Sequence, residues 1–81
     1  MKVELEEIIG ILKQANINGV YVENTALFDK GYIDSFLLLD KIIPLIEHKF
    51  NIEVEPIDLM PDNFETPLSM LEFVERKRLN E

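Results

Sequence analysis

The stretch Leu27-Phe28-Asp29-Lys30-Gly31-Tyr32-Ile33-Asp34-Ser35, followed at once by Phe36-Leu37-Leu38-Leu39, decides how this chain folds and where its chemistry lies. It places an Asp-Ser pair where a loop meets a long helical pattern. A serine at that junction offers its hydroxyl to solvent at the positive end of a helix. Helix N-termini favour negative charge and leave backbone N–H groups free, so the position suits a phosphate-linked group.

Hydrophobic periodicity predicts an all-α chain around this junction. A first helix is expected over about residues 3–15 and a second over about 35–50, joined by a long connection over about 16–34. A connection of this length in so small a domain is usually functional. The core candidates of the second helix are Leu38, Leu39, Ile42, Leu45, Ile46 and Phe50.

The C-terminal part of the chain predicts a last helix over about residues 67–78. Thr66-Pro67 is a start signal, with threonine as the N-cap and proline at the first helical position. Before it, residues 57–64 can hold one short helical turn. The final turn carries Arg76-Lys77-Arg78, whose cations complement the helix dipole. We therefore expect a small four-helix bundle of three main helices and one short helix.

Composition limits what the chain can do. Its 81 residues form one small domain, 1–81, with 47% hydrophobic residues, enough for a core but not for a deep active-site cavity. No cysteine is present and His48 is the single histidine, which speaks against disulfides, thiolate chemistry and most histidine-based metal sites. The net charge of -8 argues against nucleic acid; it either favours a partner with a basic surface or serves only solubility. No transmembrane run or signal peptide is apparent, so we expect a soluble cytoplasmic protein.

The Asp34-Ser35 pair has two interpretations. Either residue makes an ordinary helix N-cap, and in that case Ser35 has only a structural role. Three neighbouring features favour a site instead: a glycine where the loop has to turn tightly, an apolar pair that can anchor the loop, and an aromatic residue directly after the serine. These are Gly31, Leu27-Phe28 and Phe36.

The second helix also carries a candidate docking face. Four consecutive apolar residues at 36–39 cannot all face inward from one helix, so at least one is expected to be exposed beside Ser35. An exposed apolar side chain among acids favours a docking surface, although the preceding loop could cover it instead. At regular helical spacing the expected docking residues are Phe36, Asp40, Ile43 and Glu47.

The pattern Leu27-Phe28-x-x-Gly31-x-x-Asp34-Ser35-Phe36 resembles the signature of acyl and peptidyl carrier proteins. Further along, Phe50-Asn51-Ile52-Glu53-Val54 resembles their Phe-Gly-Ile-Glu-Ile exit from the second helix. The stretch from Met60 to Pro67 resembles the segment before the last helix in stand-alone carriers of the D-alanyl and aminoacyl type. The resemblance covers most of the chain and is closest to such discrete carriers.

The resemblance implies that Ser35 accepts 4′-phosphopantetheine from coenzyme A through a separate phosphopantetheinyl transferase, and that Asp34 assists. The arm ends in a thiol, which this cysteine-free chain lacks, and an acyl or aminoacyl group is carried on it as a thioester. The chain would be a monomer with no catalytic residue and no metal of its own. An adenylating ligase or acyl and aminoacyl transferases with basic surfaces would bind the docking face.

Two departures from the family pattern lie in the second helix. Pro44 removes a helical hydrogen bond, and Ser35 and Phe50 are 15 positions apart, one more than the family leads us to expect. An extra residue beside a proline can be absorbed as a π-bulge or a kink, so we expect one there. The alternative function is an acidic interaction module in which Ser35 is only a cap. An enzyme is the third and least favoured function, because the sequence offers no set of nucleophile, base and orienting group that could act together.

Overall fold

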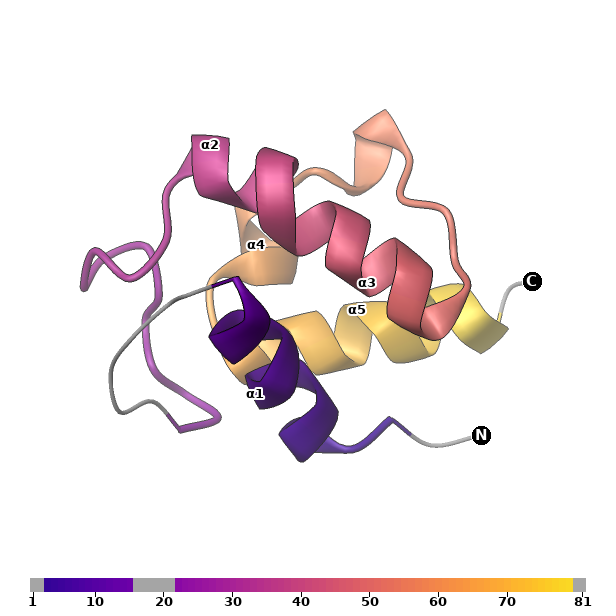
Figure 1. Cartoon of the computed structure of the whole chain (residues 1–81), viewed down its shortest axis with the longest axis horizontal. Helices are drawn as coiled ribbons and strands as arrows, with labels where there is room; N and C mark the ends of the chain where they lie inside the picture. Colours follow the sequence, from indigo (N-terminus) through magenta and orange to yellow (C-terminus); the bar gives the residue numbers. More distant parts are fainter. Residues whose placement is uncertain (1–2, 16–21, 80–81) are drawn as a thin grey trace.

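The computed structural model describes residues 3–15 and 22–79, and every regular element within them is helical (Figure 1). The all-α expectation is confirmed for this part of the chain. In chain order the elements are α1 (Leu5–Gln14), α2 (Ser35–Leu37), the π-helix η1 (Leu38–Ile42), α3 (Ile43–Phe50), the 3₁₀ helix η2 (Pro56–Asp58), α4 (Pro61–Phe64) and α5 (Pro67–Leu79).

The helix boundaries follow from local hydrogen bonds that the sequence encodes. Thr66 Oγ1 accepts the N–H of Ser69 at 3.0 Å, so the predicted start of α5 is confirmed. At α1, the backbone N–H of Glu4 donates to Glu7 Oε1 at 3.0 Å, which closes one half of a capping box. Helix α3 ends at Asn51, whose left-handed backbone (φ 56°) breaks the helical run.

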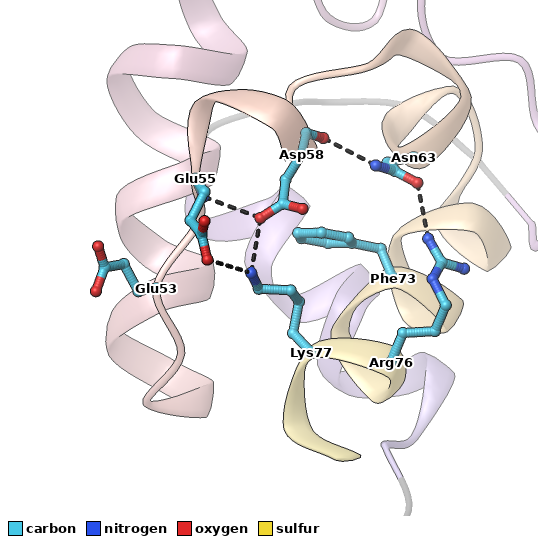
Figure 2. A pocket seen from close by; sticks show the side chains of 7 residues that line it. All are labelled: Glu53, Glu55, Asp58, Asn63, Phe73, Arg76 and Lys77. Carbon is cyan, nitrogen blue, oxygen red and sulfur yellow. Dashed lines mark hydrogen bonds and ion pairs between the residues drawn. The ribbon is translucent and has the colours of Figure 1, made fainter. Parts of the chain in front are cut away.

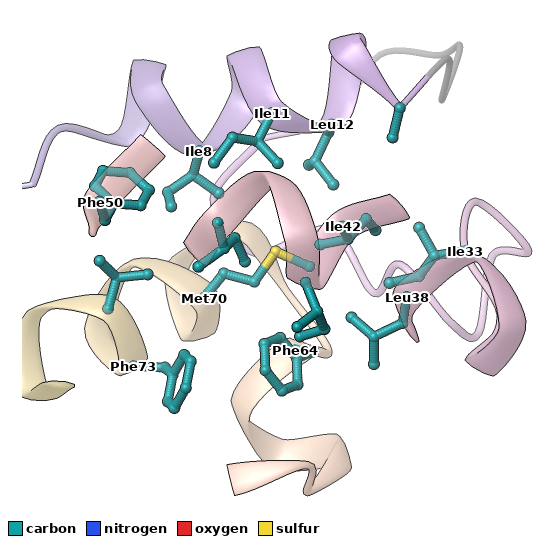
Figure 3. Packing of buried hydrophobic residues seen from close by; sticks show 14 of the residues in the cluster. Ile8, Ile11, Leu12, Ile33, Leu38, Ile42, Phe50, Phe64, Met70 and Phe73 are labelled. Carbon is teal, nitrogen blue, oxygen red and sulfur yellow. The ribbon is translucent and has the colours of Figure 1, made fainter. Parts of the chain in front are cut away.

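One hydrophobic core joins the helices. Helix α5 packs against α1, α3 and α4, and side chains from all of them meet in the space between (Figures 1 and 3). Phe64 and Phe73 stack edge to face with ring centroids 5.1 Å apart, which ties α4 to α5. The other fully buried large side chains include Ile8, Ile11, Leu12, Leu27, Ile42, Ile46 and Met70.

The helical run from 35 to 50 contains a π-bulge, one of the two distortions expected near Pro44. Residues 38–42 form a π-helix that ends two residues before Pro44. The N–H of Ile43 donates to the carbonyl of Leu38, a five-residue step that stacks these two side chains on one face. Ile43 is therefore buried at 8% exposure, and Leu39 is 53% exposed. The expectation from regular helical spacing, with Leu39 inside and Ile43 outside, is wrong.

The loop before Ser35 is anchored as the sequence predicted. Leu27 is completely buried, and its carbonyl accepts the N–H groups of Tyr32 (2.9 Å) and Ile33 (3.3 Å). Its own N–H donates to the carbonyl of Glu65 at 2.8 Å, which fixes the loop to the start of α5. Gly31 turns the chain back with φ 78°, a backbone conformation that favours glycine. The expected connection also includes residues 16–21, which lie outside the described residues.

Candidate functional site

Asp34 and Ser35 have separate roles at the start of the helix. Asp34 has an extended backbone, and its Oδ1 accepts the N–H of Leu37 at 2.8 Å, so Asp34 is the N-cap. Ser35 is the first helical residue and its side chain is exposed. Within the described part of the chain its hydroxyl makes no hydrogen bond. The interpretation of Ser35 as the cap is therefore wrong, because Asp34 fills that position.

A shallow hollow of about 210 Å³ opens beside Ser35. Its walls come from three segments that are far apart in sequence: the loop before the helix, the first turns of the helical run, and the chain between η2 and α4. The lining residues are Phe28, Ser35, Leu38, Leu59, Met60 and Pro61. Ser35 is the only polar side chain among them, so its hydroxyl lies at the edge of an apolar surface.

Phe28 and Pro61 also line a neighbouring hollow of about 340 Å³. Its other lining residues are Ala26, Asp29, Glu65 and Thr66. The two hollows therefore meet at the ring of Phe28 and the proline at the start of α4. The surface beside Ser35 is therefore hollowed in two adjoining places.

Exposed apolar side chains flank Ser35. Phe36 is 76% exposed and Leu39 is 53% exposed, which confirms that part of the apolar run 36–39 faces solvent. On the segment that supplies the opposite wall of the hollow, Leu59 and Met60 are also exposed. Exposed apolar surface of this kind is typical of a contact with another molecule.

The four expected docking residues do not form one face. Phe36 and Asp40 are exposed, as the interpretation requires. Ile43 is in the core, for the helical reason given above. Glu47 is half-buried, and its Oε2 accepts the N–H of Val54 at 2.9 Å, so it holds the chain that leaves α3. Leu39 takes the exposed place that regular spacing assigned to Ile43.

A polar cluster joins η2 to the last turns of α5 (Figure 2). Lys77 Nζ is 2.8 Å from Asp58 Oδ2 and 3.5 Å from Glu55 Oε1. The Lys77 hydrogen bond lowers the pKa of Asp58 below its ordinary value of 3.8, and the same bond raises the pKa of Lys77. The sequence predicted only a dipole role for the cations of the last turn. No local spacing signals a bond between residues 19 positions apart.

Other classes of site find no support in residues 3–15 and 22–79. Nowhere in these residues do three or more histidine, aspartate or glutamate side chains gather closely enough to hold a metal ion. In the same residues, no helix has the length and apolar character needed to cross a bilayer. No protein-family model and no solved structure matches the chain significantly.

Proposed function

We propose that this chain is a carrier protein that bears 4′-phosphopantetheine on Ser35 and presents an acyl or aminoacyl group to partner enzymes. The observation that carries the proposal is the Ser35 hydroxyl, which is exposed, unbonded within the described residues and adjacent to an apolar hollow. Serine at a helix start often uses its hydroxyl in a cap or a turn, and here Asp34 fills that role and leaves the Ser35 hydroxyl free.

The helical arrangement supports the same proposal. Helix α1, the run from 35 to 50 and α5 are the long elements, and α4 is the short one, around a single core. An acyl-carrier-like four-helix bundle has this composition, with the modified serine at the start of its second long helix. The loop anchored by Leu27 and turned at Gly31 supplies the entry to that helix.

The chemical contribution of this chain is an accessible nucleophilic oxygen, the Oγ of Ser35. In the loading reaction the Oγ of Ser35 bonds to the phosphorus that bears the pantetheine in coenzyme A. The pyrophosphate P–O bond breaks, adenosine 3′,5′-bisphosphate leaves, and the serine proton passes to a base of the transferase. The bound group supplies the thiol on which cargo is carried, and this chain has no cysteine of its own.

Asp34 would assist the loading of Ser35 by holding the start of the helix in place. Its Oδ1 is engaged with the N–H of Leu37, so the helix start is already fixed before any partner binds. The other oxygen of the same carboxylate takes no part in that bond, and it can face the metal or the cationic groups of a transferase. A preorganised helix start lowers the ordering cost of the complex.

Partner enzymes would bind the exposed side of the helical run 35–50. Phe36 and Leu39 supply apolar contact and Asp40 supplies charge, while the net charge of -8 steers basic surfaces toward the chain. The partners proposed are a phosphopantetheinyl transferase and an adenylating ligase or acyl and aminoacyl transferases. The chain would act as a monomer in the cytoplasm.

The test is loading by coenzyme A and a promiscuous phosphopantetheinyl transferase, followed by intact mass measurement. We expect one phosphopantetheine increment and one new sulfhydryl per chain. Ser35→Ala should abolish both. The matched control is Ser69→Ala, because Ser69 is the only other serine and its hydroxyl is 2.9 Å from that of Thr66. An unchanged mass for the wild type, or an equal gain in Ser35→Ala, would refute the proposal.

A second candidate is an acidic interaction module without a prosthetic group. The 76% exposure of Phe36 favours it, because an exposed phenylalanine is a contact residue with or without a modified serine. The two functions separate in the same experiment. A wild-type chain that stays unmodified, and yet binds a basic partner more weakly after Phe36→Ala, is the module rather than the carrier.

A further inference from the structure

The segment 55–63 has an unusual attachment to the rest of the molecule. It contains η2 and most of α4, yet none of its nine residues is buried. Its apolar anchors lie at its two sides, where Ile52 and Phe64 are buried and Val54 packs against the core. Burial of apolar surface therefore fixes the ends of this segment and leaves its position between them to other interactions.

Hydrogen bonds from two α5 side chains supply that attachment. Lys77 Nζ bonds Asp58 Oδ2 at 2.8 Å, and Arg76 Nη2 donates to Asn63 Oδ1 at 2.8 Å (Figure 2). Within the described residues, the weaker Lys77–Glu55 pair is the only other bond from this segment to a distant part of the chain. Figure 2 shows the two cations reaching up from α5 on either side of Phe73.

Inside the segment, further hydrogen bonds connect these two attachments. Asp58 Oδ2 also accepts the N–H of Glu55 at 2.9 Å, and its carbonyl accepts Asn63 Nδ2 and the N–H of Met60, each at 2.8 Å. Asp58 is thus the residue at which Lys77 meets the local turn, and Asn63, which Arg76 bonds, is joined to it by one of these hydrogen bonds. A displacement of Asp58 would move Leu59 and Met60 with it, since they follow it directly in the chain.

We propose that Lys77 and Arg76 form a clamp that positions the segment 55–63, so that Leu59, Met60 and Pro61 form one wall of the hollow beside Ser35. The significance of that wall rests on the proposed function, since it matters only if Ser35 is loaded. Lys77 and Arg76 are positioning residues. They act from α5, through Asp58 and Asn63, on a surface that they do not themselves line.

The ion pair between Asp58 and Lys77 persists across the neutral pH range. The groups around Asp58 are Lys77 and Arg76 from α5 and Glu55 from its own segment. The pKa of Asp58 lies below 3.8 and that of Lys77 above 10.5, so both stay ionised between these limits. The clamp is therefore a constant support for the wall and not a switch near neutral pH.

The clamp is tested on the unmodified protein by amide hydrogen exchange. Lys77→Met keeps most of the side-chain length and removes the charge. We expect roughly tenfold faster exchange at the amides of Leu59 and Met60, because a charge-assisted bond that resists local opening is lost. Arg78→Met is the matched control, since Arg78 lies in the same turn and makes no hydrogen bond or ion pair in the described residues. It should leave those amides unchanged.

Two results would overturn the clamp. One is unchanged exchange at Leu59 and Met60 in Lys77→Met. The other is an equal acceleration at the amide of Met70 in the core helix α5, which would mean a general loss of stability. The consequence for Ser35 is measured separately, as the rate of phosphopantetheine loading. We expect Lys77→Met to load several-fold more slowly than Arg78→Met. Equal loading rates refute the link to Ser35. A failure of every variant to load refutes the proposed function, while the exchange result still decides the clamp.

Discussion

The π-helix before Pro44 reverses which side chains of the helical run stabilise the core, and alanine substitutions measure this directly. Ile43 is 8% exposed and Leu39 is 53% exposed. Ile43→Ala removes about three buried carbon groups at about 0.8 kcal/mol each, and the remaining cavity adds to that loss. We expect Ile43→Ala to lower the free energy of unfolding by about 3 kcal/mol and Leu39→Ala by less than about 1 kcal/mol.

Urea unfolding followed by circular dichroism at the helical signal gives the assay. A domain of this size has about 4–12 kcal/mol of stability in total, so a loss of about 3 kcal/mol is readily measured. With a urea dependence near 1 kcal/mol per M, the midpoint should move by about 2–3 M for Ile43→Ala. A Leu39→Ala variant as destabilised as Ile43→Ala, or more so, would show that the run is a regular α-helix and that the buried face has been assigned to the wrong residues.

Three further outcomes are expected. Asp34→Ala should lower stability by about 1 kcal/mol in urea unfolding through the lost N-cap, and no loss would mean that Asp34 is not the cap. The pKa of Asp58 is lowered by Lys77, so its contribution is present above about pH 4 and is lost as the pH falls through the lowered pKa; Asp58→Asn should lose less stability than the wild type on acidification below about pH 4, and equal losses would contradict the pairing. Phe36→Ala should reduce kcat/KM for loading at least several-fold with unchanged helicity, and Val22→Ala, exposed on the loop, serves as the control; a variant that unfolds would place Phe36 in the core.

The parts of the fold that the sequence predicts are those set by local chemistry. The helical run 35–50 was expected from its apolar spacing, and the start of α5 from Thr66-Pro67. Gly31 and Leu27 were recognised as the turn and the anchor of the loop, and both have those roles. The helical run, the start of α5 and the turn at Gly31 depend on residues close in sequence or on a strong preference of one residue type. For Leu27 the sequence indicates burial, but it does not indicate the bond to Glu65.

The parts that the sequence missed depend on position in space. The sequence favours a π-bulge or a kink near Pro44, but regular helical spacing still gives the wrong directions for Leu39 and Ile43. Helical spacing assigns Glu47 to the docking face, and only the path of the chain after α3 places the N–H of Val54 against it. The wall formed by residues 59–61 and its link to Lys77 join segments that no periodicity connects.

If Ser35 is loaded as we propose, the separate roles of Asp34 and Ser35 keep the start of the helix intact. A capping oxygen cannot be esterified without the loss of the bond it makes to the helix, and the helix start would weaken at the moment of modification. Here the capping bond belongs to the carboxylate of Asp34, at 2.8 Å from the N–H of Leu37. The hydroxyl of Ser35 is left exposed at the next position. A phosphate on that oxygen would lie near the free N–H groups of the first helical turn, where negative charge is favoured.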